Sequence, residues 1–177
     1  MAKTISFNLS SSSVENAIKE LKAYQKTLEY KCKMFCEVLI ESGNIAAQRQ
    51  IDESPLSNYI IMKTNIKPEI MGCKGILTAT GMTKETEYGP VNYLLLVEFG
   101  AGIYFNPVDN PLASKYGMGV GTFPNQTHAF ENGWYYPDDK GVWHFTHGTK
   151  ATMPMYNADT IMIMNSLNFA KQIFKNN

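Results

Sequence analysis

The sequence predicts an α+β fold in which a long amino-terminal helix and a carboxy-terminal helix pack on a twisted antiparallel sheet. Apolar side chains recur at helical spacing over residues 13–42 and again over 154–175. Two β-rich runs lie between these helices, and residues 99–150 are rich in aromatic residues, glycine and proline. With 177 residues, of which 44% are apolar, the chain can bury one sizeable core, so a single domain spanning 1–177 is expected.

The first segment is expected to be a short strand that leads into the long helix. Residues 4–9 alternate between polar and apolar side chains, which is typical of a strand. Ser12 and Glu15 then have the S-x-x-E spacing of a capping box, which predicts that the helix begins near Ser13.

The long helix is expected to run from residue 13 to residue 42. Gln25 is the one polar residue in its apolar stripe, and Gly43 with Asn44 predicts its end. A short second helical piece is expected over residues 45–51. Such a helix usually lies along a sheet, and a two-stranded coiled coil is disfavoured because the pattern ends after about four heptads.

The central region is expected to supply the sheet. The runs 58–67 and 69–82 predict an antiparallel hairpin with Pro68 between its strands, and residues 83–89 are expected to form a loop. The apolar run around Tyr93–Val97 fits either a further strand, which would extend the sheet over 91–98, or a buried helical turn.

The aromatic region is expected to combine ordered loops with a second hairpin. Residues 88–150 hold 13 of the 21 aromatic residues, both tryptophans and all three histidines. Strands at 133–136 and 142–146, joined by the turn 137–141, are predicted there.

The closing helix is expected to begin at Pro154, a favoured first helical residue, and to end near Lys175. Its apolar residues occupy most of its sides. This pattern predicts burial against more than one neighbour, including the long first helix.

The charge composition bears on the class of partner. Lys and Arg total 16, Asp and Glu total 16, and Arg49 is the single arginine, which argues against nucleic acid as the main partner. The first residues lack the apolar stretch of a signal peptide, and no apolar run approaches the roughly 20 residues that a membrane span needs. No membrane partner is expected.

The three cysteines do not suggest a disulfide framework. Cys32 and Cys36 lie four residues apart on one face of a helix, and Cys73 is distant in sequence. We expect reduced thiols that pack as small hydrophobic groups, in preference to a metal or redox role.

A zinc site is the first chemical alternative. His128, His144 and His147, together with Asp138 and Asp139, include the right ligand types. On a strand, however, positions 144 and 147 point to opposite faces, and no helical H-E-x-x-H motif exists. Hydrogen-bonded histidines within an aromatic cluster are therefore expected, with no metal.

Enzymatic motifs are also weak. No G-x-S-x-G elbow is present, and the glycines of 117–121 do not have the spacing of a phosphate-binding loop. Glu98 with Asp138 or Asp139 leaves a glycoside hydrolase open as an alternative. We predict no catalytic residue, no cofactor and no enzyme activity.

Residues spread over the second half of the chain resemble a known family. They are Val97-Glu98-Phe99-Gly100-Ala101-Gly102, Gly133-Trp134-Tyr135-Tyr136, Trp143, Thr146-His147-Gly148, Ala151, Pro154, Met155 and Ala158. Together they resemble the head-to-tail joining family of long-tailed bacteriophages, whose members are also described as tail-completion, neck or minor capsid proteins.

The resemblance implies a structural, non-enzymatic virion protein of the phage neck, assembled in the host cytoplasm. Its implied partners are copies of itself in a homo-oligomeric ring, connector or head-closure proteins on one side and tail tube or terminator proteins on the other, with at most passive contact with DNA in the lumen. A tail-terminator or connector protein of another family, or a small virion-associated hydrolase, is the alternative.

Under this interpretation, Glu98, beside Gly100 and Gly102, is expected to be a structural carboxylate at a sharp strand exit. Six aromatic residues are candidate interface anchors, although intramolecular packing is an equal alternative and Trp134 and Trp143 fit a core better. The six are Tyr104, Phe105, Tyr116, Trp134, Tyr135 and Trp143.

Overall fold

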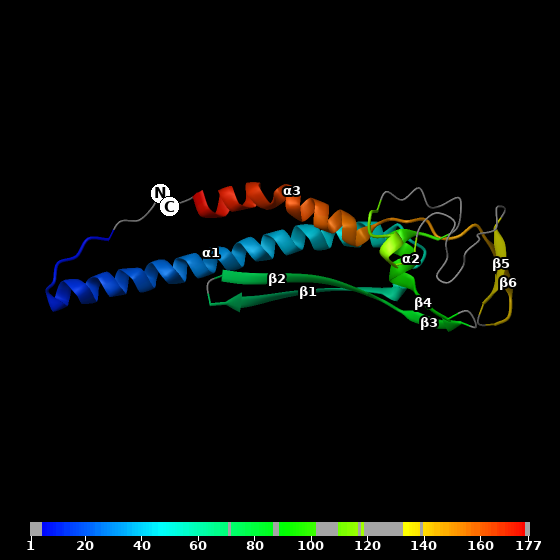
Figure 1. Cartoon of the computed structure of the whole chain (residues 1–177), viewed down its shortest axis with the longest axis horizontal. Coiled ribbons are helices and arrows are strands. Elements are labelled where there is room, and N and C mark those ends of the chain that lie inside the picture. The colour runs from blue at the N-terminus through cyan, green and yellow to red at the C-terminus, as the bar shows by residue number, and fades with distance from the viewer. Residues whose placement is uncertain are drawn as a thin grey trace.

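Helix α1 (Ser11–Asp52) runs along most of the length of the molecule, and the other elements are arranged around it (Figure 1). Helix α3 (Pro154–Lys175) lies on one side of α1, and the hairpin of β1 (Ile60–Glu69) and β2 (Gly72–Gly81) lies on the other. The computed structural model describes residues 5–70, 72–86, 89–101, 110–116, 118, 133–138 and 140–175. The α+β class is confirmed.

Helix α1 is longer than predicted at its carboxyl end, because Gly43 does not terminate it. A Cβ atom at this glycine would lie 2.7 Å from Sδ and 2.9 Å from Cγ of Met162. The glycine therefore gives α3 room to approach α1. The buried face of the helix continues through Ala47 and Ile51, so the separate helix expected at 45–51 is part of α1.

The start of α1 also differs from the prediction. Ser10 is the N-cap, and its Oγ accepts a hydrogen bond of 3.4 Å from the backbone N–H of Ser13. The prediction of a capping box formed by Ser12 and Glu15 is therefore wrong. The described part of the expected first strand, residues 5–9, is not a strand.

The β1–β2 hairpin is confirmed as antiparallel, with its pairs running from Ile60 opposite Gly81 to Glu69 opposite Gly72. Pro68 lies within β1, opposite Cys73, and not between the strands as predicted.

Close contact holds the hairpin against α1. A Cβ atom at Gly75 of β2 would lie 2.5 Å from Cγ1 of Ile40. Cys36 donates a hydrogen bond of 3.3 Å to the backbone oxygen of Cys73. The strand and the helix therefore approach as closely as the glycine permits.

The segment after β2 forms a second hairpin and a helix. Strands β3 (Thr83–Thr86) and β4 (Gly89–Asn92) pair where a loop was predicted. Helix α2 (Tyr93–Phe99) follows, so the alternative of a strand over 91–98 is wrong beyond Asn92. Asn92 decides this, because its Oδ1 accepts from the backbone N–H groups of Leu94 at 2.9 Å and Leu95 at 3.4 Å and so caps the helix.

The predicted later hairpin is confirmed as β5 (Trp134–Pro137) paired with β6 (Trp143–Thr146). The strands of the described residues form three separate two-stranded sheets, so the single sheet predicted over 58–82 and 91–98 is wrong. Short 3₁₀ turns at Ser57–Tyr59 and Ser114–Tyr116 complete the described elements.

Helix α3 begins at Pro154 as predicted and packs along α1, with the Phe174 ring 6.1 Å from that of Phe35. The predicted burial on several sides is wrong for the single chain. Only Pro154 and Ala158 of this helix are buried, and Ile163 and Leu167 are largely exposed.

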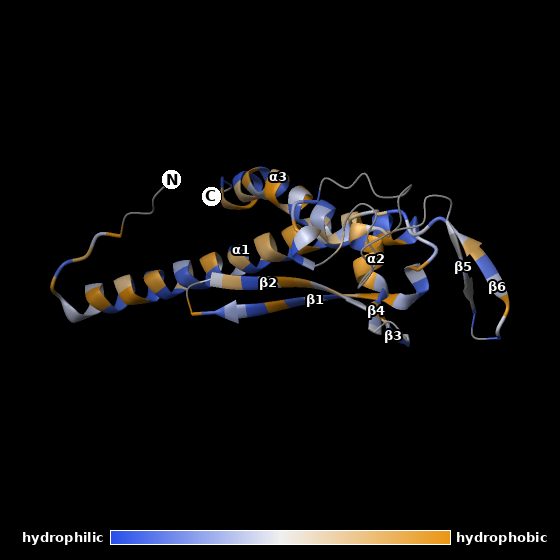
Figure 2. Cartoon of the chain, turned by 45° about the vertical axis from the view of Figure 1, so that its right-hand side comes forward, coloured by the Kyte–Doolittle hydropathy of each residue, from blue (hydrophilic) through white to orange (hydrophobic). Residues whose placement is uncertain are grey.

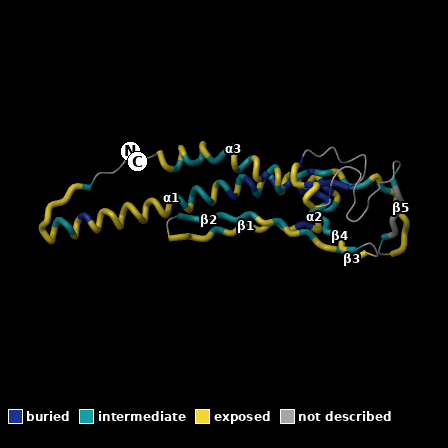
Figure 3. The backbone as a smooth tube through the Cα atoms, viewed as in Figure 1, coloured by how far each residue is buried: buried dark blue, intermediate teal, exposed yellow. Residues whose placement is uncertain are grey.

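The core is concentrated at one end of the molecule, where α2 meets the carboxyl half of α1 (Figure 3). Its buried members are Val91, Leu96, Phe99, Ala101, Ala113 and Met118 in one cluster, and Ile51, Ile60 and Val97 in a second. The amino-terminal half of α1 extends away from this core and is mostly exposed.

Candidate protein-interaction surface

Glu98 joins the end of α2 to the start of α3. Its carboxylate accepts hydrogen bonds from the backbone N–H of Met155 at 2.8 Å, from that of Tyr156 at 3.0 Å and from Nδ2 of Asn110 at 3.2 Å. Pro154 has no N–H to donate, so the Glu98 side chain accepts from the next two free backbone donors of α3. The prediction of a structural carboxylate is consistent with this geometry.

Backbone pairing surrounds Glu98 and completes the junction between α2 and α3. The N–H of Thr152 donates to the oxygen of Val97 at 2.9 Å. Ala101 and Thr149 exchange hydrogen bonds of 2.8 and 2.9 Å. Gly100, at φ 73°, closes α2 in a conformation that disfavours other residues. Many of the residues on which the resemblance to the phage family rests thus come together at this junction and have structural roles.

Burial and hydrogen bonding act in opposite directions on Glu98. Burial raises the pKa of its carboxyl group, and the two backbone N–H donors and Asn110 partly offset that rise. Both carboxylate oxygens already accept hydrogen bonds from the protein.

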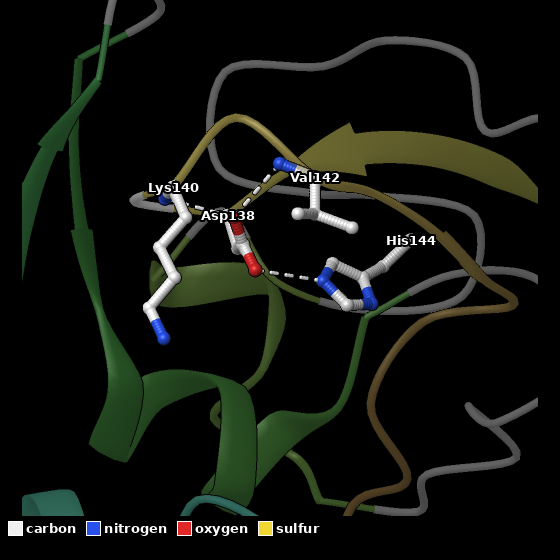
Figure 4. A network of polar contacts seen from close by, with 4 residues as sticks. All are labelled: Asp138, Lys140, Val142 and His144. Carbon is white, nitrogen blue, oxygen red and sulfur yellow. Dashed lines mark hydrogen bonds and ion pairs between the residues drawn. The ribbon is translucent and has the colours of Figure 1, made fainter.

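Asp138 organises the turn between β5 and β6 (Figure 4). Its Oδ1 accepts from the backbone N–H groups of Lys140 at 2.8 Å and Val142 at 2.9 Å, and its Oδ2 lies 2.9 Å from Nε2 of His144. The hydrogen bond with His144, and then that with Val142, lower the pKa of Asp138. Glu98 and Asp138, which were considered as carboxylates for hydrolysis, therefore each accept hydrogen bonds from separate parts of the backbone. Asp139 lies outside the described residues.

The histidines do not gather around a metal in the part of the chain that the structure describes. No group of three or more potential ligands is found there. His144 faces Asp138, and the His147 ring packs edge-on against Phe145 with centroids 4.9 Å apart. His128 lies outside the described residues.

One face of the β5–β6 hairpin presents aromatic side chains to solvent, and we call it the aromatic face. Tyr135 lies directly opposite Phe145, with ring centroids 5.1 Å apart, and Trp143 is two residues from Phe145 on the same face. Their exposed fractions are 65%, 49% and 66% for Tyr135, Phe145 and Trp143. The expectation that Trp143 belongs to a core is therefore wrong.

The other predicted anchors have different outcomes. Tyr116 stacks on Phe99 with centroids 5.5 Å apart and is half exposed, so it lies beside the core and not on the aromatic face. The side chain of Trp134 lies outside the described part of the structure, as do Tyr104 and Phe105. Phe145 was missed, although its spacing of two from Trp143 was a signal for a shared face.

A second exposed apolar surface lies on α1, where the sequence predicted a buried stripe. Hydrophobic residues alternate with hydrophilic ones along the whole helix (Figure 2). In its amino-terminal half Ala17 is buried, but the larger side chains Ile18, Leu21 and Leu28 remain exposed. The sequence could not reveal this, because α3 and the β1–β2 hairpin cover only the carboxyl half.

The cysteines are free, in agreement with the predicted absence of a disulfide framework among them. All three are half-buried. Burial, followed by the interaction with Cys73, raises the pKa of the Cys36 thiol to about 11.

Comparison with known proteins gives no match, whether with protein-family models, with curated proteins or with solved structures. Among the described residues, no helix has both the length and the apolarity needed to cross a membrane.

Proposed function

We propose that this protein is a structural subunit of the neck of a long-tailed phage, where it joins the head connector to the tail as one member of a homo-oligomeric ring. It acts by protein contacts, without cofactor or catalysis. The virion neck is its site of action after assembly in the host cytoplasm. The resemblance of residues 97–102 and 133–158 to head-to-tail joining proteins motivates this proposal.

The aromatic face is the observation that carries the proposal. Tyr135, Trp143 and Phe145 are largely exposed on a short hairpin, although burying each would be favourable. Tyr and Trp are enriched among the residues that dominate protein–protein binding. A face of this kind suits docking on another virion protein.

The junction around Glu98 supports the same role. It fastens α2, which precedes the segment that carries the hairpin, to α3, which follows that segment. A docking hairpin needs a rigid base, because movement of the base would cost binding entropy. The junction around Glu98 provides such a base.

The test uses a phage that carries this gene with the paired changes Tyr135→Ser and Trp143→Ser. We expect filled heads lying beside complete but detached tails in electron micrographs of the lysate. Ile61→Ser removes an equally exposed apolar side chain from β1 and serves as the matched control, with intact particles expected.

A stop codon at Glu15 gives the null phenotype for comparison. Intact particles that fail to enter cells would contradict the neck role and favour the alternative of a virion-associated hydrolase. Normal infectious particles from both the null and the paired variant would remove the proposal altogether. Tails of abnormal length would instead indicate a tail-terminator protein.

A further inference from the structure

The amino-terminal half of α1 extends beyond every element that packs on the helix (Figures 1 and 3). Helix α3 ends at Lys175, next to the contact between Phe174 and Phe35. The hairpin on the other side reaches the helix at Cys36, which donates to Cys73. Residues 11–30 thus form roughly 30 Å of helix with no neighbouring helix or strand in the described part of the chain.

One face of this extension is basic and partly apolar, and we call it the basic face. Its residues are Glu15, Ile18, Lys19, Lys22, Ala23 and Lys26. Three lysines against one glutamate give it a positive balance, and Ile18 at its edge is 45% exposed.

The opposite character is found in a groove on the carboxyl half of α1, which we call the acidic groove. It has a volume of about 580 Å³ between α1, β1 and α3 and is lined by Glu37, Val38, Ile40, Glu41, Ser42, Ile45, Thr64, Ile66 and Phe169. Its only charged side chains are the two glutamates, and Glu37 is also 3.6 Å from Lys33 on α1. Ile45, at 60% exposed, gives the groove an uncovered apolar wall.

We infer that the basic face of one copy of this chain docks in the acidic groove of a second copy. Lysines 19, 22 and 26 would meet glutamates 37 and 41 at the rim, while Ile18 contacts the apolar wall formed by Val38 and Ile45. Complementary charge fixes the partner and the register, and burial of Ile18 against the apolar wall supplies the attraction.

The two surfaces favour a head-to-tail arrangement over a twofold dimer. An antiparallel pair of α1 helices related by a twofold axis would have to use one continuous face of the helix. Lys22 and Glu41 are 19 residues apart, which at 3.6 residues per turn places them about 100° apart around the helix. A head-to-tail contact leaves one basic face and one acidic groove free on each pair, so copies add until a ring closes.

This inference rests on the ring of the proposed function, but its test does not need a phage. Purified chain, mixed from natural and ¹⁵N-labelled protein, is treated with a carbodiimide, which joins a lysine amine to a touching carboxylate. We expect mixed-isotope crosslinks between the peptides of Lys19–Lys26 and those of Glu37 or Glu41, within an assembly of several copies. Raising the salt concentration should weaken the assembly.

Charge reversal provides the matched variants. Lys22→Glu with Lys26→Glu should weaken self-association about tenfold, as should Glu37→Lys with Glu41→Lys. Mixing the two variants should restore association, because the reversed basic face of the first variant is then complementary to the reversed acidic groove of the second. Lys150→Glu, an exposed lysine outside both surfaces, is the control and should associate normally.

A chain that stays monomeric, crosslinks that arise elsewhere, or a closed dimer would each overturn the inference. If the phage test gives detached heads and tails while these crosslinks are missing, the neck role stands and this contact is wrong. If the crosslinks form and the phage shows no defect, the contact stands and the neck role is wrong.

Discussion

Glu98 satisfies two backbone donors at the start of a helix that lies 56 residues later in the sequence. The sequence suggested a structural carboxylate from its glycine neighbours, but it could not identify Met155, Tyr156 and Asn110 as the partners. Those contacts depend on how α2 and α3 meet, which no local pattern records.

Glu98→Ala should lower the free energy of unfolding by about 2 kcal/mol, because two part-buried N–H groups at the start of α3 would lose their acceptor. Glu98→Gln should cost less, since the amide keeps one acceptor oxygen and avoids burying a charge. Denaturant unfolding measures both, with Glu85→Ala, an exposed glutamate, as the control. If Glu98→Ala were as stable as the unchanged protein, the junction would not depend on this carboxylate.

Asp138 should make the β5–β6 hairpin sensitive to acid. Its folded pKa lies below the ordinary value of 3.8 because of the hydrogen bonds with His144 and Val142. The stabilisation is therefore complete above about pH 4 and is lost as the pH falls through the folded pKa.

Both tryptophans of the chain, Trp134 and Trp143, belong to this hairpin, so their fluorescence reports its opening as the pH is lowered. The variant Asp138→Asn keeps an acceptor for the turn but cannot ionise at this position. This variant should lose the change in tryptophan fluorescence that marks the acid opening of the hairpin. An unchanged transition would show that another group causes the opening.

At the scale of elements, the predictions succeeded where one local signal dominated. The two β-rich runs predicted the β1–β2 hairpin, the turn at 137–141 predicted the β5–β6 hairpin, and Pro154 predicted the start of α3. Gly43 misled the prediction because a glycine that ends a helix and a glycine that admits a neighbouring side chain look alike in sequence. The Asn92 cap, in contrast, was a usable signal for α2.

Gly81→Ala should destabilise the fold where β2 meets α2. A Cβ atom there would collide with the backbone nitrogen of Leu94 and lie 2.8 Å from Oδ1 of Asn92, which caps α2. We expect a loss of about 1–3 kcal/mol in the free energy of unfolding.

Gly72→Ala is the matched control, because nothing lies within 4 Å of a Cβ atom at the other end of the same strand. Thermal melting of the two variants gives the comparison. Equal melting temperatures would show that the close approach at Gly81 is relieved without cost.

At the scale of the whole molecule, the α+β class was predictable, but the extent to which α1 is covered was not. An apolar stripe in sequence has the same pattern whether it is covered by the same chain or by another. The sequence therefore predicted a core for Ile18, Leu21 and Leu28, and the structure leaves them exposed. The single domain and the neck role remain predictions.

The paired backbones of Ala101 and Thr149 have a consequence for how this protein can vary. The chain leaves the junction at Ala101 and returns to it at Thr149, so the connection between these two residues is closed at its base by their backbone hydrogen bonds. Doubling the length of such a loop costs only about 0.6 kcal/mol in closure entropy. Asn110, Ala113 and Met118 belong to the junction and the core and would have to be kept. Outside these positions, segments of different length and sequence can be exchanged on one scaffold, which would let related proteins acquire new binding specificities while they keep the same helices.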